Sequence, residues 1–187
     1  MNFQEYIEKA LKTKAPVESD LEDLRHGAAG IVKEVGELVD LYTKHKFWGK
    51  PPEYVDLLKE VGDVYWYLGL TFRSLGGTYE PAVADMFLPS HEYCLTKLVV
   101  YSANLFAGAY GSPESSEFLL YEANKLYQFL NVFCIINGLT KEDAWAGNLV
   151  KLQGKEGKKG RYSGSFSQHE ALNRNLELEN ENELPEA

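Results

Sequence analysis

The sequence predicts an all-α protein, and three features lead to that prediction. Hydrophobic residues recur at a spacing of three or four along nearly the whole chain, and no stretch alternates apolar and polar residues as a half-exposed strand would. Residues that cap or end helices divide the chain into segments of ordinary helical length. With 187 residues, 44% of them hydrophobic and 25% charged, the chain can bury one sizeable core.

Start and stop signals delimit six helices. Ser19 opens the capping-box pattern SDLE, Pro51 and Pro52 suit a first helical turn, and Gly76 and Gly138 suit helix ends. We predict helices over residues 3–13, 19–44, 51–75, 90–109, 112–137 and 140–152, with residues 78–89 irregular. The helical domain then covers residues 1–162, with residues 78–137 as a two-helix insertion, and residues 163–187 form an acidic C-terminal tail.

The charge of the chain argues against some partners. The net charge is -9, and the tail holds six Glu and one Arg, so an acidic protein of this kind is a poor binder of duplex DNA. Residues 151–162 hold five basic residues and one acid. That loop could meet a small polyanion, or it could simply be solvated.

The start of the chain is acidic and amphipathic, and no segment approaches the roughly 18 consecutive apolar residues of a membrane span. We therefore expect a cytoplasmic protein that does not enter a membrane. Cys94 and Cys134 lie in apolar helical patterns without metal-ligand spacing, which predicts buried reduced thiols.

A nearly repeated pentapeptide is the most informative local feature. Residues 33–37 read KEVGE and residues 59–63 read KEVGD, so Glu34 with Glu37 and Glu60 with Asp63 each form a two-carboxylate patch on a helix. The short loop between the two helices predicts an antiparallel hairpin. Both acidic pairs lie equally far from the turn, so we expect all four carboxylates to converge.

Converging carboxylates need a cation, because like charges in a partly dry groove are costly. Oxygen ligands in this number suit Mg²⁺, with Mn²⁺ as an alternative. The chain has no Glu-x-x-His pattern, which argues against a di-iron site. Gly36 and Gly62 would leave room near the site. A single acidic pair of this kind is more often only a solvated helix face; the facing arrangement of two pairs favours metal binding.

The arrangement resembles the MazG-like, all-α nucleoside triphosphate pyrophosphohydrolases, whose signature is ExxE followed some twenty residues later by ExxD. The resemblance is carried by HGAAGIVKEVGELVDLYTKHKFWGK, LLKEVGDVYWYLGL, INGLTKEDAWAGNLVKLQ and GRYSGSFS. It covers residues 20–76 and 137–168, and the two inserted helices depart from it. It implies a helical bundle that hydrolyses a nucleoside triphosphate to the monophosphate and pyrophosphate with Mg²⁺.

The resemblance also implies roles for particular residues. Glu34, Glu37, Glu60 and Asp63 would bind the metal, with Glu34 or Glu37 as the general base. Asn148, Lys151 and Arg161 would contact the triphosphate.

Weaker signals concern the rest of the substrate. His26 lies on the same helical face as Glu37, three turns earlier, and the small residues of HGAAG between them indicate either a hollow for a base or sugar or close helix packing. Trp48, or Trp66 with Tyr67, could stack on a nucleobase, although aromatic residues are more often core or interface residues.

Two questions stay open at this level. The rival interpretation is a non-catalytic helical bundle with a structural cation site and a partner-binding tail. The acidic hairpin is also too small to bury its faces alone, so either the inserted helices or a second chain must complete the bundle. We expect a homo-oligomer, a dimer or a tetramer.

Overall fold

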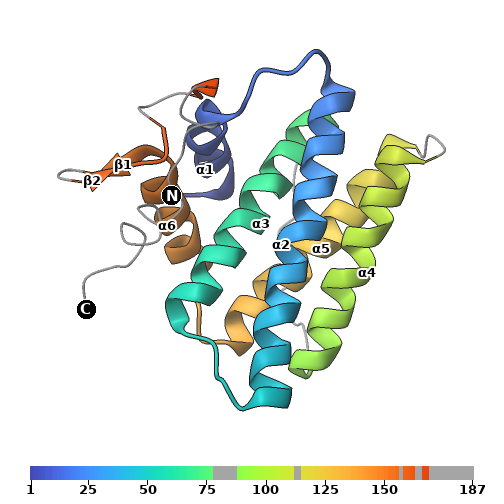
Figure 1. Cartoon of the computed structure of the whole chain (residues 1–187). Coiled ribbons are helices and arrows are strands. Elements are labelled where there is room, and N and C mark those ends of the chain that lie inside the picture. Colours follow the sequence, from blue (N-terminus) through green and yellow to red (C-terminus); the bar gives the residue numbers. More distant parts are fainter. Residues whose placement is uncertain (78–87, 112–114, 156–157, 163–165, 169–187) are drawn as a thin grey trace.

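The computed structural model describes residues 1–77, 88–111, 115–155, 158–162 and 166–168, and these residues form six α-helices (Figure 1). The helices are α1 (Phe3–Ala10), α2 (Asp20–Trp48), α3 (Tyr54–Ser74), α4 (His91–Tyr110), α5 (Ser116–Ile136) and α6 (Lys141–Gln153). A short 3-10 helix, η1 (Leu11–Thr13), continues α1. After α6, β1 (Gly154–Lys155) pairs antiparallel with β2 (Lys158–Lys159), and the described residues form no other strand pair.

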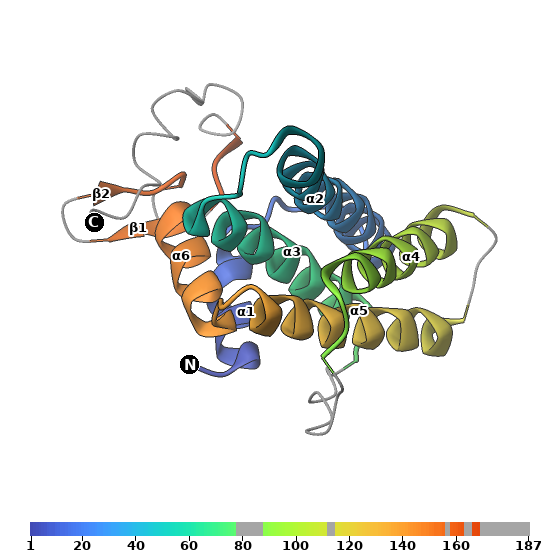
Figure 2. The same cartoon turned by 90° about the horizontal axis from the view of Figure 1, so that it is seen from below.

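Helix α3 is the centre of the molecule. Helices α2 to α5 pack as a four-helix bundle, in which α2 contacts α3 and α4, and α5 contacts α3 and α4. Helices α1 and α6 pack against another side of α3 and against each other, which Figure 2 shows in end view. The inserted pair α4 and α5 therefore completes the bundle within one chain, and the bundle itself needs no second subunit.

Most predicted helix ends agree with the structure, and two differ for local reasons. The Ser19 hydroxyl accepts a hydrogen bond from the Glu22 amide and starts α2 as predicted. Helix α2 runs four residues beyond the predicted Lys44, because Gly49 is the residue that adopts the left-handed conformation of a C-cap, with φ of 66°. Helix α3 starts at Tyr54 rather than at the prolines. Lys50 and Pro51 each precede a proline and so avoid the helical region, and Glu53 is the extended N-cap residue, with ψ of 150°.

The inserted helices lie near the predicted positions, although α5 starts later than predicted. Helix α4 begins after Ser90, whose hydroxyl accepts a hydrogen bond from the Tyr93 amide, and α5 begins after Ser115, whose hydroxyl accepts one from Phe118. The predicted start of α5, residue 112, is four residues before the observed Ser116, and residues 112–114 lie outside the described residues. The same is true of residues 78–87 of the predicted irregular segment 78–89 and of most of the acidic tail.

An aromatic cluster joins α1 to the bundle. The rings of Phe3 and Tyr6 stack on Trp145 of α6 or lie tilted beside it, and Phe3 also contacts Tyr65 of α3 and Tyr127 of α5. All five side chains are almost completely buried. This cluster fixes the layer of α1 and α6 against α3, and so determines what lies over the repeated pentapeptides.

Both cysteines are buried and unbridged, as the sequence predicts. Burial raises the pKa of each thiol to about 12. Among the helices formed by the described residues, none combines the length and the hydropathy that a membrane span requires.

Candidate functional site

Three carboxylates meet where α2 and α3 run antiparallel. Oxygen atoms of Glu34, Glu60 and Asp63 lie within 4.8 Å of one another. Glu34 comes from α2, and Glu60 and Asp63 are three residues apart on α3, so the hairpin brings both pentapeptides to one level as predicted. We refer to these three residues as the carboxylate group.

Each acid of the carboxylate group has a lysine nearby, Lys33 at Glu34, Lys59 at Glu60 and Lys151 at Asp63, but one buried oxygen of the group has no donor. The Glu34 side chain is 4% exposed, and its Oε2 has no hydrogen-bond partner among the described residues, while Oε1 accepts a 2.8 Å bond from Lys33. Burial, and next the negative charges of Asp63 and Glu34, raise the pKa of Glu60 to about 7. A buried carboxylate oxygen without a donor, in an all-oxygen group, fits a divalent cation such as Mg²⁺.

Glu37 does not join the carboxylate group. It is exposed on α2, whereas Glu34 is buried. Residues three apart on a helix differ by about 60° around its axis, which is enough to direct one side chain toward α3 and the other toward water. The structure thus brings three of the four predicted carboxylates together, and the fourth lies beside them.

Helix α6 covers the carboxylate group and supplies its polar partners. The Asn148 amide donates a 2.8 Å hydrogen bond to Asp63 Oδ1, and the Lys151 ammonium lies 2.7 Å from Asp63 Oδ2. Both residues were predicted from sequence to lie at the site. The close approach depends on Gly62: a Cβ there would lie 2.9 Å from the Ala144 carbonyl oxygen and 3.1 Å from Asn148 Cβ.

Gly36, the glycine of the other pentapeptide, has no such role. A Cβ at Gly36 would meet nothing within 4 Å, so this glycine faces open space. The expectation that both glycines leave room at the site therefore holds for Gly62 only.

A pocket of about 300 Å³ opens beside the carboxylate group. Glu34, Asp63 and Asn148 line one part of it, and the remaining wall is formed by His26, Trp66, Tyr67, Arg161, Tyr162, Phe166, Thr13, Ala15 and Leu152. Arg161 reaches the pocket because its backbone amide bonds the Lys151 carbonyl at 2.8 Å, which folds the chain back along α6. His26 and Arg161 thus lie where the sequence predicted them, next to the acidic residues.

The aromatic wall of the pocket is built around His26. Its ring lies edge-on to both Trp66 and Tyr67, with centroids 5.9 and 5.6 Å away. Burial is the main cause of a lowered His26 pKa, and Lys14 lowers it further while Asp23 opposes the change. A neutral imidazole can both donate and accept a hydrogen bond.

The small residues after His26 serve helix packing. A Cβ at Gly30 would collide with the Tyr67 ring, and one at Gly27 would lie 2.5 Å from the Thr71 hydroxyl oxygen. The sequence left two interpretations of these small residues open, close helix packing and a hollow for a base or sugar. Close packing applies to Gly27 and Gly30. The pocket lies next to them, beside His26.

Trp48 lies away from this pocket. It is 69% exposed at the C-terminal end of α2 and is not among the residues that line the pocket. Fourteen residues of helix separate it from Glu34, a distance of about 21 Å along the axis. Of the two tryptophans that the sequence offered for stacking on a nucleobase, Trp66 is the one that lines the pocket.

Two contributions escaped sequence reasoning. The buried Tyr6 hydroxyl donates a 2.8 Å hydrogen bond to Asn148 Oδ1 and lies 3.3 Å from the Gly62 carbonyl oxygen. Lys14 and Asp23 form a largely buried ion pair at 2.8 Å near His26. The apolar spacing of α1 places Tyr6 on its buried face, but no sequence pattern shows which polar group its hydroxyl meets.

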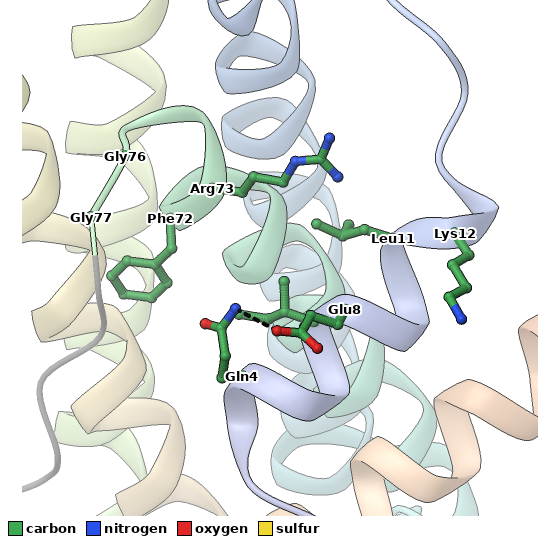
Figure 3. Close-up of a pocket in the computed structure, with 9 residues that line it drawn as sticks. Gln4, Glu8, Leu11, Lys12, Phe72, Arg73, Gly76 and Gly77 are labelled. Atoms are coloured by element: carbon green, nitrogen blue, oxygen red, sulfur yellow. Dashed lines mark hydrogen bonds between the residues drawn. The ribbon is translucent and has the colours of Figure 1, made fainter.

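A second pocket, of about 510 Å³, lies between α1 and the C-terminal end of α3 (Figure 3). Its rim carries side chains of both signs, Glu8, Lys12 and Arg73, and Gln4 donates a 3.3 Å hydrogen bond to Glu8. None of the site residues predicted from sequence lines it. We therefore place the candidate site at the carboxylate group.

Together these observations define an all-α protein of six helices, over the described residues, with a buried three-carboxylate group that could hold a metal ion. Comparison with models of protein families, with curated proteins and with solved structures found no match. Any function must accordingly be argued from the site itself.

Proposed function

We propose that the protein is a Mg²⁺-dependent nucleoside triphosphate pyrophosphohydrolase, which converts an NTP or dNTP to the monophosphate and pyrophosphate. The observation that carries the proposal is the position of Lys151 and Asn148, which contact Asp63 of the carboxylate group at the edge of an aromatic pocket. This supports the proposal because carboxylates that could hold a cation, an ammonium and an amide that could bind phosphate, and aromatic side chains that could stack on a base lie together there. The MazG-like pattern of the sequence points to the same chemistry.

Glu34, Glu60 and Asp63 would hold the cation. When bound, Mg²⁺ would neutralise charge that develops on the phosphates during hydrolysis. The proposal also accounts for the ammonium of Lys151 beside Asp63, one of the three carboxylates that would bind the metal. In this structure Lys151 pairs with Asp63. If Asp63 held a cation instead, Lys151 would be free to place its charge on the leaving pyrophosphate.

Glu37 is the better candidate for the general base. It lies outside the carboxylate group and is exposed to water, so it stays available to take a proton from the attacking water, whereas Glu34 belongs to the ligand set. Glu37→Gln should then lower kcat and leave Mg²⁺ binding intact. Glu60→Gln should weaken Mg²⁺ binding itself.

The pocket beside the carboxylate group is the proposed base and sugar site. A nucleobase could stack on the exposed part of Trp66 or Tyr67, while His26 offers a donor and an acceptor. Arg161, which follows β2 and lines the pocket, would add positive charge near the phosphates.

The test is a screen for pyrophosphate release from a panel of NTPs, dNTPs and damaged nucleotides, with Mg²⁺ and with excess EDTA. We expect release from at least one nucleotide, only with the metal, and a loss of at least 100-fold in Asp63→Asn. Asp56→Asn, an exposed carboxylate on the same helix, is the matched control and should retain activity.

Full activity in EDTA or in Asp63→Asn would contradict the proposal. The structural-cation alternative predicts a different result: Mg²⁺ raises the melting temperature, but no nucleotide of the panel binds or is hydrolysed.

A further inference from the structure

One side of α4 is apolar and exposed. Residues 98–110 of the chain, LVVYSANLFAGAY, contain no charged residue. Within them Val99, Val100, Phe106 and Tyr110 are 43%, 44%, 40% and 47% exposed. A helix that is apolar on all sides is normally buried on all sides. In Figure 2, α4 lies at the edge of the bundle, with α2 and α5 on its inner side.

These side chains follow a helical stripe. Thr96, Val99, Val100, Ala103, Phe106, Ala107 and Tyr110 are all exposed and recur at intervals of three and four residues. Val32 of the neighbouring α2, 38% exposed, is a further uncovered apolar side chain. We call the seven α4 residues the α4 face.

The polar atoms of the α4 face are already satisfied within the chain. The Thr96 hydroxyl donates a 2.8 Å hydrogen bond to the Glu92 carbonyl, and the Tyr110 hydroxyl donates one of 3.2 Å to the Arg25 carbonyl. Covering this face would therefore leave no side-chain donor without a partner. The usual penalty for burying a hydroxyl is absent.

The α4 face is symmetric about Ala103. Val99 and Val100 lie four and three positions before it, and Phe106 and Ala107 lie three and four positions after it; Thr96 and Tyr110 lie seven positions to either side. If a second α4 crosses antiparallel at Ala103, Val100 meets Phe106 of the other copy and Val99 meets Ala107. The two small alanines at position 103 permit the helices to approach closely.

We propose that the α4 face binds a second copy of this chain through an antiparallel α4 pair with a two-fold axis near Ala103. A face that is complementary to itself is the requirement for such an interface, and two-fold dimers are the commonest oligomers. Helix α4 is about 30 Å long, and with the flank of α2 it offers roughly 600 Å² per chain, or about 1,200 Å² in total. That area is at the lower limit for a stable, specific interface.

This interface does not rest on the proposed enzymatic function and leaves the candidate site open. Glu34 is buried against α3. Val32, on the same helix, is exposed on the side of the bundle where α4 lies. The earlier reason for expecting an oligomer, an incomplete bundle, no longer applies, since α2 to α5 close it within the chain.

The first test compares the mass in solution of the wild type with that of Ala103→Glu, by light scattering on a sizing column. The wild type should have twice the mass of one chain, and Ala103→Glu should have the mass of one chain with an unchanged circular dichroism spectrum. Two opposed glutamates at the axis would repel one another. Ala146→Glu, an exposed alanine on α6, is the control and should stay dimeric.

The second test is independent of the stability of that variant. Ala103→Cys should form a disulfide-linked dimer under mild oxidation, because position 103 lies at the axis, whereas Ala146→Cys should not. Cys94 and Cys134 are 0% and 2% exposed and should not react.

A wild type that is monomeric at tens of micromolar would overturn the proposal, as would a dimer that Ala103→Glu leaves intact and Ala103→Cys does not cross-link. A monomer that co-sediments with phosphatidylglycerol vesicles would instead assign the α4 face to a lipid surface.

Discussion

Asp63 is the residue at which the candidate site and the fold depend on each other. One carboxylate oxygen accepts from Asn148 and the other contacts Lys151, and both partners are on α6. The ion pair is mostly buried, with side-chain exposures of 8% for Lys151 and 16% for Asp63. Removing one partner of such a pair leaves a buried charge, which is why Asp63 matters for stability as well as for chemistry.

The Tyr6 hydroxyl holds Asn148 in the orientation that lets its amide reach Asp63. Tyr6→Phe should lower the free energy of unfolding by about 1 to 3 kcal/mol, because the buried Asn148 oxygen loses its donor. Chemical denaturation measures this. Tyr54→Phe, at an exposed tyrosine, should change the stability by less than about 0.5 kcal/mol and is the control. Equal effects in both variants would contradict the role given to Tyr6.

The raised pKa of Glu60 predicts a pH dependence of stability in the absence of divalent cations. Its pKa is about 7 in the folded protein against an ordinary value of 4.5, so the folded state holds this proton more tightly than the unfolded state does. The stability contributed by the protonated group is full below pH 4.5 and is lost as the pH rises through 7. The expected loss is about 1 to 3 kcal/mol.

Denaturation at pH 5 and pH 8 in EDTA checks this dependence, and Glu60→Gln should reduce it. Adding Mg²⁺ at pH 8 should restore stability to the wild type and not to Glu60→Gln. If the cation has no effect on the wild type at pH 8, the carboxylate group does not bind it.

At the scale of elements, the two pentapeptides have the same local sequence and different surroundings. Gly62 lies under α6, so Gly62→Ala should push α6 away from α3 and destabilise the protein by about 1 to 3 kcal/mol. Gly36 faces open space, so Gly36→Ala should stabilise α2 by up to about 1 kcal/mol. Melting temperatures should therefore shift in opposite directions. A shift of the same sign in both variants would mean that α6 does not rest on Gly62.

Helix α6 lies outside the four-helix bundle and is held mainly by α3. Trp145 packs into the aromatic cluster that α1 shares with the bundle, and Asn148 and Lys151 bind Asp63 of α3. The cover of the candidate site and the scaffold that carries the carboxylates are therefore different elements.

For the whole molecule, this division predicts how local opening is distributed. Backbone amides of α1 and α6 should exchange with deuterium faster than those of α3 and α5, because the latter lie inside the bundle. Mg²⁺ with a non-hydrolysable nucleotide should slow exchange in α6 and little elsewhere. Hydrogen exchange with mass spectrometry measures both. A uniform change across all six helices would contradict the division into a scaffold and a cover.

Much of this architecture can be predicted from the sequence, because it depends on local rules. Apolar periodicity predicts all six helices, and Ser19 and Ser90 cap helices as expected. Glu34 and Asp63 lie equally far from the hairpin turn, with Glu60 one helical turn from Asp63, which predicts that the three meet. Three helix limits were displaced by a few residues: the end of α2, where Gly49 decides the backbone conformation, the start of α3 after the two prolines, and the start of α5.

The sequence by itself determined the helices and the facing acidic residues, since both depend on spacing within a helix or across one short loop. Only the tertiary structure decided that Glu37 faces water, that Trp66 rather than Trp48 lines the pocket, and that α6, with Asn148 held by Tyr6, covers Asp63. The orientation of a side chain around its helix, and contacts such as Tyr6 with Asn148, 142 residues apart, follow from how the helices pack against one another.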